Sequence, residues 1–549
     1  MESEIGKTRA FQQYMESAEG GNHSEQFNLG FCYQHGIGTT KDEKKAFQWY
    51  LKSAEGGDSK GQNNLGNCYR YGIGTVKDEE KAFQWYLKSA EAGNHKGQNS
   101  LGYCYHYDEK KVFQWYLESA EGGSSEGQNS LGYCYQYGIG TVKDEKEAFQ
   151  WYVKSAEGGN SGGQNNLGEL YYYGEGTTKD DEKAFQWYLK SAEAGNRKGQ
   201  SNLGYCYQHG IGTIKDEKKA FQWYLKLAEG GNSKGQNSLG YCYQYGIGTT
   251  NDKEKAFQWY LKSAEAGNHK GQNSLGYCYQ HGIGTTKDEK KAFQWYLKSA
   301  MGDRSEGHFS LGYCYQHGIG TTNNEEKTFQ WYLKSAEGGD NKGQNNLGYC
   351  YQHEIVTTKD EEKAFQWYMK SAEGGVGEGQ NNLGYCYQYG IRTTKDEKKA
   401  FQWYMKSAEG GYHEGQYNLG YCYHNRIGTA KDEEKAFQWY LKSTKGGNSK
   451  GQYNLGYCYH IGIGTTKDEN KAFQEDSDRQ NDLGYCYQYR GNHLGQYNLG
   501  YCYYNGIGTI KDEKKALHWY SMSAEGGNTD AQIMLEEIYL HSNNLHLSK

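Results

Sequence analysis

The sequence predicts an all-α protein, an α/α superhelical solenoid of about fifteen helix–turn–helix repeats of 36 residues each. One observation behind this prediction is a fixed period, and the other is a pair of helical patterns inside each period. The string FQWY recurs every 36 residues, apart from one interval of 30, and the cysteines follow the same spacing. Its tryptophans are Trp49, Trp85, Trp115, Trp151, Trp187, Trp223, Trp259, Trp295, Trp331, Trp367, Trp403 and Trp439.

The first helical pattern of a repeat is clear in the copy that runs from Ser59 to Asn94. Leu65, Cys68 and Tyr69 follow Gly61 at i+4, i+7 and i+8, which places all four on one face of a helix. Gly72 and Gly74 are expected to end this helix, because glycine adopts the left-handed conformation without a Cβ penalty.

A second helix is expected after a possible capping box, Thr75-x-x-Asp78. This helix presents Ala82, Tyr86 and Ala90 on one side, with Trp85 alongside. No stretch alternates with the period of two that a strand requires. Each hairpin therefore exposes an apolar stripe that only a neighbouring hairpin can bury.

Composition excludes several other classes of protein. The chain has no proline, which excludes collagen, and 15% aromatic residues, which argues against disorder despite a mean hydropathy of −1.05. It lacks a long apolar run, so we expect no membrane insertion. Its 61 basic and 67 acidic residues give a net charge of −6, which offers no electrostatic basis for nucleic-acid binding.

These residues resemble the Sel-1-like repeat family, which is related to the tetratricopeptide repeat but has a longer loop between its helices. The pattern is LGxxYxxGxG…DxxKAxxWYxxSAxxG, matched by Leu65, Gly66, Tyr69, Gly72, Gly74, Asp78, Lys81, Ala82, Trp85, Ala90 and Gly93. Of these, Leu65, Gly66, Tyr69, Gly72, Gly74, Ala82, Trp85 and Ala90 are expected to be structural. One departure recurs: the family usually has alanine where this chain has Gly61, which should allow closer helix contact.

We expect one continuous solenoid domain over residues 1–549. Residues 1–22 form an N-terminal cap half-repeat, 23–472 regular repeats, 473–498 an irregular repeat, and 499–549 the last repeat with a C-terminal capping helix. The repeat near 104–115 is shortened because the inter-helix loop is missing, which predicts either a single long helix or a very tight turn. The N-terminus has no apolar signal region, and the expected location is cytoplasmic.

Cysteine and histidine recur at fixed positions of the repeat, where they are candidates for disulfide or metal chemistry. Fourteen cysteines occur, one per repeat, and are expected to be buried reduced thiols. Histidine follows three residues later at His35, His209, His281, His317 and His353, but tyrosine replaces it in most other copies, so no metal is expected. The GIG loops lack a phosphate-binding pattern, and no catalytic constellation is present, which predicts a protein without cofactor that is not an enzyme.

Binding residues are expected on the first helix of each repeat, which lines the concave groove in the related tetratricopeptide fold. The positions carried over lie two residues before the leucine and two, five and six residues after it. The candidates are Asn63, Asn67, Arg70, Tyr71, Asn237, Tyr241, Tyr245, Asn273, Tyr277, Gln280, His281, Tyr313, His317, Tyr417 and Tyr421. Amide and aromatic groups in this pattern suit an extended peptide.

The resemblance implies a non-enzymatic scaffold or adaptor that binds protein or peptide partners through its concave face, in signalling or in the assembly of complexes. A carbohydrate-binding protein or a regulator of cell-wall synthesis is the alternative, because tyrosine- and amide-rich grooves also suit sugars. An enzyme is a third class, since some cysteine-rich relatives are linked to β-lactam hydrolysis. RNA binding is a fourth, but it usually needs a basic groove.

Overall fold

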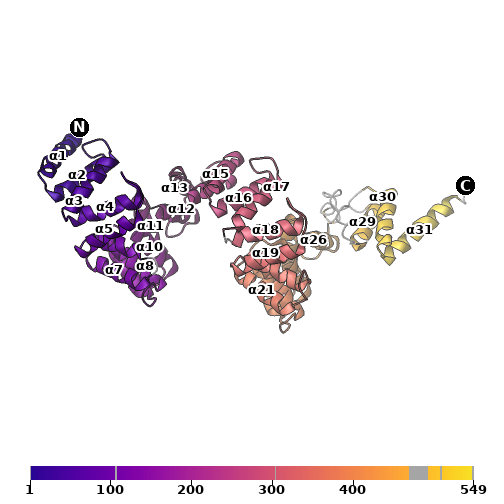
Figure 1. The fold of residues 1–549 in the computed structure, drawn as a ribbon. Coiled ribbons are helices and arrows are strands. Elements are labelled where there is room, and N and C mark those ends of the chain that lie inside the picture. The colour runs from indigo at the N-terminus through magenta and orange to yellow at the C-terminus, as the bar shows by residue number, and fades with distance from the viewer. Residues whose placement is uncertain are drawn as a thin grey trace. The chain divides into compact units, whose positions relative to one another are not determined.

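The computed structural model describes residues 2–105, 108–302, 305–468, 471, 493–506 and 510–546, and within these ranges it is built of helices without a strand. The helices alternate between the two types that the sequence predicts, called here first and second helices (Figure 1). Contacts divide the chain into two compact units. Unit 1 is Met1–Ser274 with Ile283–Thr285, and unit 2 is Leu275–Gly282 with Thr286–Lys549.

In unit 1 the helices pack in chain order, each against the next. The second helices are α1 (Glu2–Glu19), α3 (Glu43–Glu55), α5 (Glu79–Glu91), α7 (Glu109–Glu121), α9 (Glu145–Glu157), α11 (Asp181–Glu193), α13 (Glu217–Glu229) and α15 (Lys253–Glu265). The first helices are α2 (His23–His35), α4 (Ser59–Tyr71), α6 (His95–Cys104), α8 (Ser125–Tyr137), α10 (Ser161–Tyr173), α12 (Arg197–His209) and α14 (Ser233–Tyr245). Helix α16 (His269–His281) spans the division between the units.

Unit 2 repeats this arrangement. Its second helices are α17 (Glu289–Ala300), α19 (Glu325–Glu337), α21 (Glu361–Glu373), α23 (Glu397–Glu409), α25 (Glu433–Lys445) and α30 (Glu513–Glu525). Its first helices are α18 (Ser305–His317), α20 (Asn341–Gln352), α22 (Gly377–Tyr389), α24 (His413–Asn425), α26 (Ser449–Ile461), α29 (His493–Asn505) and α31 (Thr529–His546). From α18 to α26, each first helix also contacts the next first helix, which forms a continuous face.

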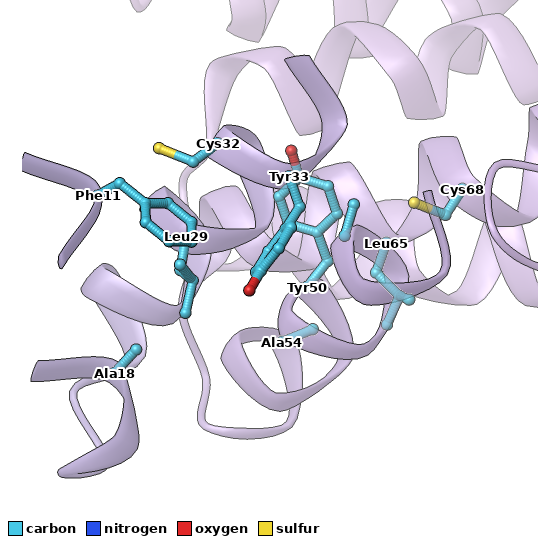
Figure 2. Packing of buried hydrophobic residues seen from close by; sticks show 10 residues of the cluster. Phe11, Ala18, Leu29, Cys32, Tyr33, Tyr50, Ala54, Leu65 and Cys68 are labelled. Carbon is cyan, nitrogen blue, oxygen red and sulfur yellow. The ribbon is translucent and has the colours of Figure 1, made fainter. Parts of the chain in front are cut away.

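The core of each repeat is a tyrosine of the second helix set against the first helix. Tyr86 is fully buried, and a methyl group on Gly66 would lie 2.6 Å from its ring. Ala82 and Ala90 are buried around it, and Leu65 is buried in the adjoining cluster around Tyr50, as predicted. Figure 2 shows the equivalent core around Tyr50.

Neighbouring repeats are joined by aromatic and small-residue contacts. Phe47 of α3 meets Tyr69 of α4 edge to face, with ring centroids 5.5 Å apart. A methyl group on Gly61 would overlap the Oγ of Ser53, so glycine replaces the family's alanine where the preceding helix carries this serine. Trp85 is half-buried and its ring lies under the ammonium of Lys88 at 4.2 Å.

The predicted glycine terminators are confirmed, but the predicted capping box is wrong. Gly72 and Gly74 have φ angles of 73° and 68°. Thr75 lies outside the helix, and the N-cap of α5 is Asp78, whose side chain accepts a hydrogen bond from the Lys81 N–H at 3.0 Å. A carboxylate at the N-cap satisfies a helix N–H that has no partner within the helix, which explains why the threonine is not needed there.

The single long helix predicted near 104–115 is also wrong. Helix α6 ends at Cys104, Tyr105 has a non-helical conformation, and α7 begins at Glu109. The Asp108 N–H donates to the Tyr105 carbonyl at 3.2 Å, so the chain makes the tight turn of the other alternative. Most of the predicted irregular repeat, 473–498, lies outside the described residues.

Candidate aromatic binding face

Exposed aromatic pairs recur on the first helices, two and six residues after the buried leucine. We call them the aromatic row. In each pair the two ring centroids lie 4.1–4.5 Å apart with the planes tilted by 36–48°. In unit 1 the pairs are Phe31/His35, Tyr133/Tyr137, Tyr205/His209 and Tyr241/Tyr245. In unit 2 they are Tyr277/His281, Tyr313/His317, Tyr349/His353 and Tyr385/Tyr389.

The rings of the aromatic row are open to solvent. The tyrosines range from 37% exposed at Tyr313 to 60% at Tyr137, although tyrosine usually buries most of its ring. Six of the predicted candidates belong to these pairs: Tyr241, Tyr245, Tyr277, His281, Tyr313 and His317. The structure therefore places them on one exposed helix face in each unit, where they are free of core packing.

In unit 1 the guanidinium of Arg70 stacks on tyrosine rings of this face. The guanidinium carbon of Arg70 lies 3.9 Å from the ring centroid of Tyr103 on α6 and 5.1 Å from that of Tyr71. Side chains at these positions thus meet between adjacent first helices, and the predicted candidates Arg70 and Tyr71 form a single stacked group.

Two of the predicted amide candidates, Asn67 and Gln280, accept hydrogen bonds from buried tyrosines of the core. The Tyr86 hydroxyl donates to Asn67 Oδ1 at 2.8 Å, and the Tyr296 hydroxyl donates to Gln280 Oε1 at 2.7 Å. A buried phenol needs such an acceptor, because an unpaired hydroxyl inside the protein is costly. These two amides therefore act as acceptors for buried tyrosines of the core.

Amides two residues before the leucine link successive first helices, a role that was missed from the sequence. Asn63 Oδ1 accepts from Ser100 Oγ at 3.1 Å, and Asn237 Oδ1 accepts from Ser274 Oγ at 3.0 Å. The spacing is 37 residues in both cases, and the same spacing joins Asn129 to Asn166, Asn165 to Asn202, Asn345 to Asn382 and Asn381 to Asn418. The predicted candidate Asn273 occupies this position on α16 and is half-buried.

Tyr417 and Tyr421 differ from the paired rings. Tyr417 is half-buried between Tyr421 and Tyr440, with centroids 6.2 and 6.1 Å away, and burial raises its pKa to about 12. Tyr421 is 38% exposed. Only Tyr421 of the two therefore offers an open ring.

The thiols point into the core. Of the twelve cysteines whose side chains the structure describes, eleven are buried, Cys104 is half-buried, and all twelve are free. Burial raises the pKa of Cys68, Cys134 and Cys278 to about 12. Cys278 is buried while His281 stacks on the exposed Tyr277, so these two side chains do not converge. Within the described ranges no cluster of three or more His, Cys, Asp or Glu residues is placed to hold a metal.

We expect Cys104 to react first when the native protein is treated with iodoacetamide, because alkylation needs an accessible thiolate and the other described thiols are buried. Peptide mapping by mass spectrometry separates it, because its flanking sequence HYDEKK is unlike that of other repeats. Uniform alkylation of Cys68 and Cys104 would contradict the structure.

The free energy of unfolding should fall as the pH rises above about 9. Thiols of the unfolded chain ionise near pH 8.5, whereas the buried thiols of the folded chain hold their protons to about 12.

Unit 2 contains a cavity of about 600 Å³ on this same face. Its walls include Tyr313, His317 and Tyr349 of the aromatic row, together with Lys342, Glu378 and Tyr412. The sequence differs here from the other repeats, with Gly377 at the start of α22 and Val376 and Tyr412 at N-cap positions that elsewhere mostly hold Asn or Asp. These departures are the signal that would have pointed to the cavity.

Comparison with known proteins identifies the repeat. The Sel1 repeat model matches residues 26–58, 59–94, 95–124, 125–160, 161–196, 197–232, 233–268, 269–303, 305–340, 341–376, 377–412, 413–448, 449–474 and 493–528. Among curated proteins none matches the chain. Within the described residues, no helix combines the length and the apolar character needed to cross a membrane.

The chain is also similar to proteins of solved structure. The chain is similar to c5321, a protective antigen of uropathogenic Escherichia coli with an SLR fold, at 32% identity over 86% of this chain and 94% of that one, with a TM-score of 0.46. It is also similar to a Sel1 repeat protein from Oxalobacter formigenes, at 27% identity over 56% and 89% of the two chains, with a TM-score of 0.37. The family model covers fourteen repeats and nearly the whole chain. The chain belongs to the Sel1 repeat family.

Proposed function

We propose that this protein is a non-enzymatic scaffold that binds extended segments of partner proteins along the face of its first helices. The observation that carries the proposal is the aromatic row, because stacked rings recur at matching positions in successive repeats and stay exposed. Tyrosine supplies a large contact area at low entropic cost, and it is enriched where proteins bind one another.

The chemistry of the face suits a peptide backbone. Asn and Gln side chains occur on the same helices as the exposed rings, and an extended peptide presents N–H and C=O groups at regular spacing beside its side chains. Binding several repeats at once gives a long interface from small contacts, which fits a role in signalling or in the assembly of complexes. Twelve free thiols support a reducing, cytoplasmic location.

The test uses α14 in unit 1. A random dodecapeptide phage library is selected on the full chain, and the affinity of an enriched peptide is measured by fluorescence anisotropy. Replacing both Tyr241 and Tyr245 with alanine should weaken binding about tenfold or more, since both rings are exposed contact surface. Gln258→Ala, an exposed change on α15, is the matched control and should have no effect.

Two results would contradict the proposal. One is the absence of any enriched peptide, or an affinity that the tyrosine changes leave unaltered. The other is retention of the chain on an immobilised polysaccharide that depends on the same two tyrosines, which would favour the carbohydrate-binding alternative.

A further inference from the structure

The cavity of unit 2 is lined in part by Gly377, the first residue of α22, which has no side chain. Apart from α22, each described first helix begins with Ser, Thr, His, Arg or Asn. In several repeats this side chain covers the glycine turn at the end of the second helix of the same pair. Asn341 Nδ2 donates to the Gly374 carbonyl at 3.0 Å, and Arg197 Nη2 donates to the Gly230 carbonyl at 3.3 Å.

Helix α22 begins with Gly377 and has no side chain to cover Gly410. A methyl group on Gly410 would meet only backbone oxygens of α23, whereas at Gly374 it would meet the Asn341 side chain. Gly410 and Gly411 instead line the cavity. The turn therefore presents backbone to a space that, at Gly374, the Asn341 side chain occupies.

The walls of the cavity favour a planar cation. Phe309, Tyr313, Tyr349 and Tyr412 supply aromatic rings. Glu378 is partly open to solvent, and it supplies a carboxylate whose pKa is raised by desolvation. Desolvation of a carboxylate makes a cationic partner more favourable. Lys342 lies near Glu378, but its side chain is exposed and can turn away into solvent.

We propose that this cavity binds an arginine side chain of a peptide ligand, an inference that rests on the proposed peptide-binding function. Guanidinium is planar, stacks on aromatic rings and offers several donors at once, so it can reach both a carbonyl and a carboxylate. The chain shows both halves of this arrangement with its own residues, since Arg197 donates to a turn carbonyl and Arg70 stacks on Tyr103. A volume of about 600 Å³ also leaves room for flanking peptide backbone.

The test measures binding of acetyl-Gly-Arg-Gly-amide to the full chain by saturation-transfer NMR, with peptides carrying citrulline or lysine in place of arginine. The arginine peptide should bind at least tenfold more tightly than the citrulline peptide, because citrulline keeps the shape but loses the charge. Glu378→Gln should weaken binding about tenfold, while Glu337→Gln, the same charge change on exposed α19, should not.

A second variant restores the arrangement of the other repeats. Gly377→Asn combined with Tyr412→Asn gives α22 a covering side chain and places asparagine at the next N-cap, the two positions that Ser59 and Asn94 occupy in unit 1. This variant should keep its melting temperature and lose arginine binding. Equal binding of the citrulline or lysine peptide, or binding that survives in both variants, would overturn the proposal. Dodecapeptides that still depend on Tyr241 and Tyr245 would show that the proposed function stands while the arginine cavity fails.

Discussion

Replacing Tyr152 with alanine is expected to lower the free energy of unfolding by about 3–5 kcal/mol, the usual cost of removing a large aromatic side chain from a core. Tyr152 is fully buried against Gly132, and its hydroxyl donates to Gln136 Oε1 at 2.9 Å. The loss should appear in chemical denaturation and as faster hydrogen exchange in α8 and α9, because each repeat is stabilised mainly by its neighbours.

Two control variants divide this effect into its parts. Tyr152→Phe keeps the ring and removes only the hydrogen bond, so we expect a loss of about 1 kcal/mol. Tyr137→Ala removes the same side chain from an exposed site of α8, 60% open to solvent, and should change stability by less than about 0.5 kcal/mol. Equal losses for Tyr152→Ala and Tyr137→Ala would show that the core is not where the structure places it.

The second large effect is expected at the inter-helix loop. Gly74→Val should cost about 3 kcal/mol, because φ at this position is 68° and a side chain would overlap the carbonyl oxygen of Glu43 in α3. Unit 2 offers the reverse experiment, since Val356 occupies the equivalent position with φ of 62°. Val356→Gly should raise stability by about 1 kcal/mol, as the relief of strain exceeds the added freedom of the unfolded chain.

Both changes are measured by thermal melting and by hydrogen exchange. The exchange is followed in α4 and α5 for Gly74→Val and in α20 and α21 for Val356→Gly. A melting temperature that falls in Val356→Gly, or that is unaffected in Gly74→Val, would contradict the role of this loop in joining repeats. Arg392, at φ 53° in the next loop, provides an independent copy of the same exchange.

Much of the repeat follows from residue spacing. Leu65, Ala82 and Ala90 lie where a period of 3.6 residues places them, and Gly72 and Gly74 adopt the left-handed conformation that glycine permits. The N-cap was misplaced at Thr75, since threonine and aspartate both accept helix N–H groups and only the helix start decides between them. The residue pattern also does not predict that the helix ends before Tyr105, because no glycine stands there.

The binding candidates lie on first helices, as their spacing predicts, but the contacts that several of them make were not predictable. Asn67 and Gln280 accept hydrogen bonds from buried tyrosines, and Asn63 and Asn237 bond to the next first helix. Spacing within one helix indicates which side chains share a face, but it does not reveal a partner that lies 16 to 37 residues away.

By itself, the sequence determined the repeat, the two helices in it and the residues that bury its core, because each depends on local periodicity and on glycine at turns. Tertiary structure alone decided which polar side chains are consumed inside the stack and which rings stay exposed. It also revealed the cavity that Gly377, Gly410 and Gly411 line in part. Such features depend on contacts between residues that are distant in sequence, and those contacts exist only once neighbouring helices have packed.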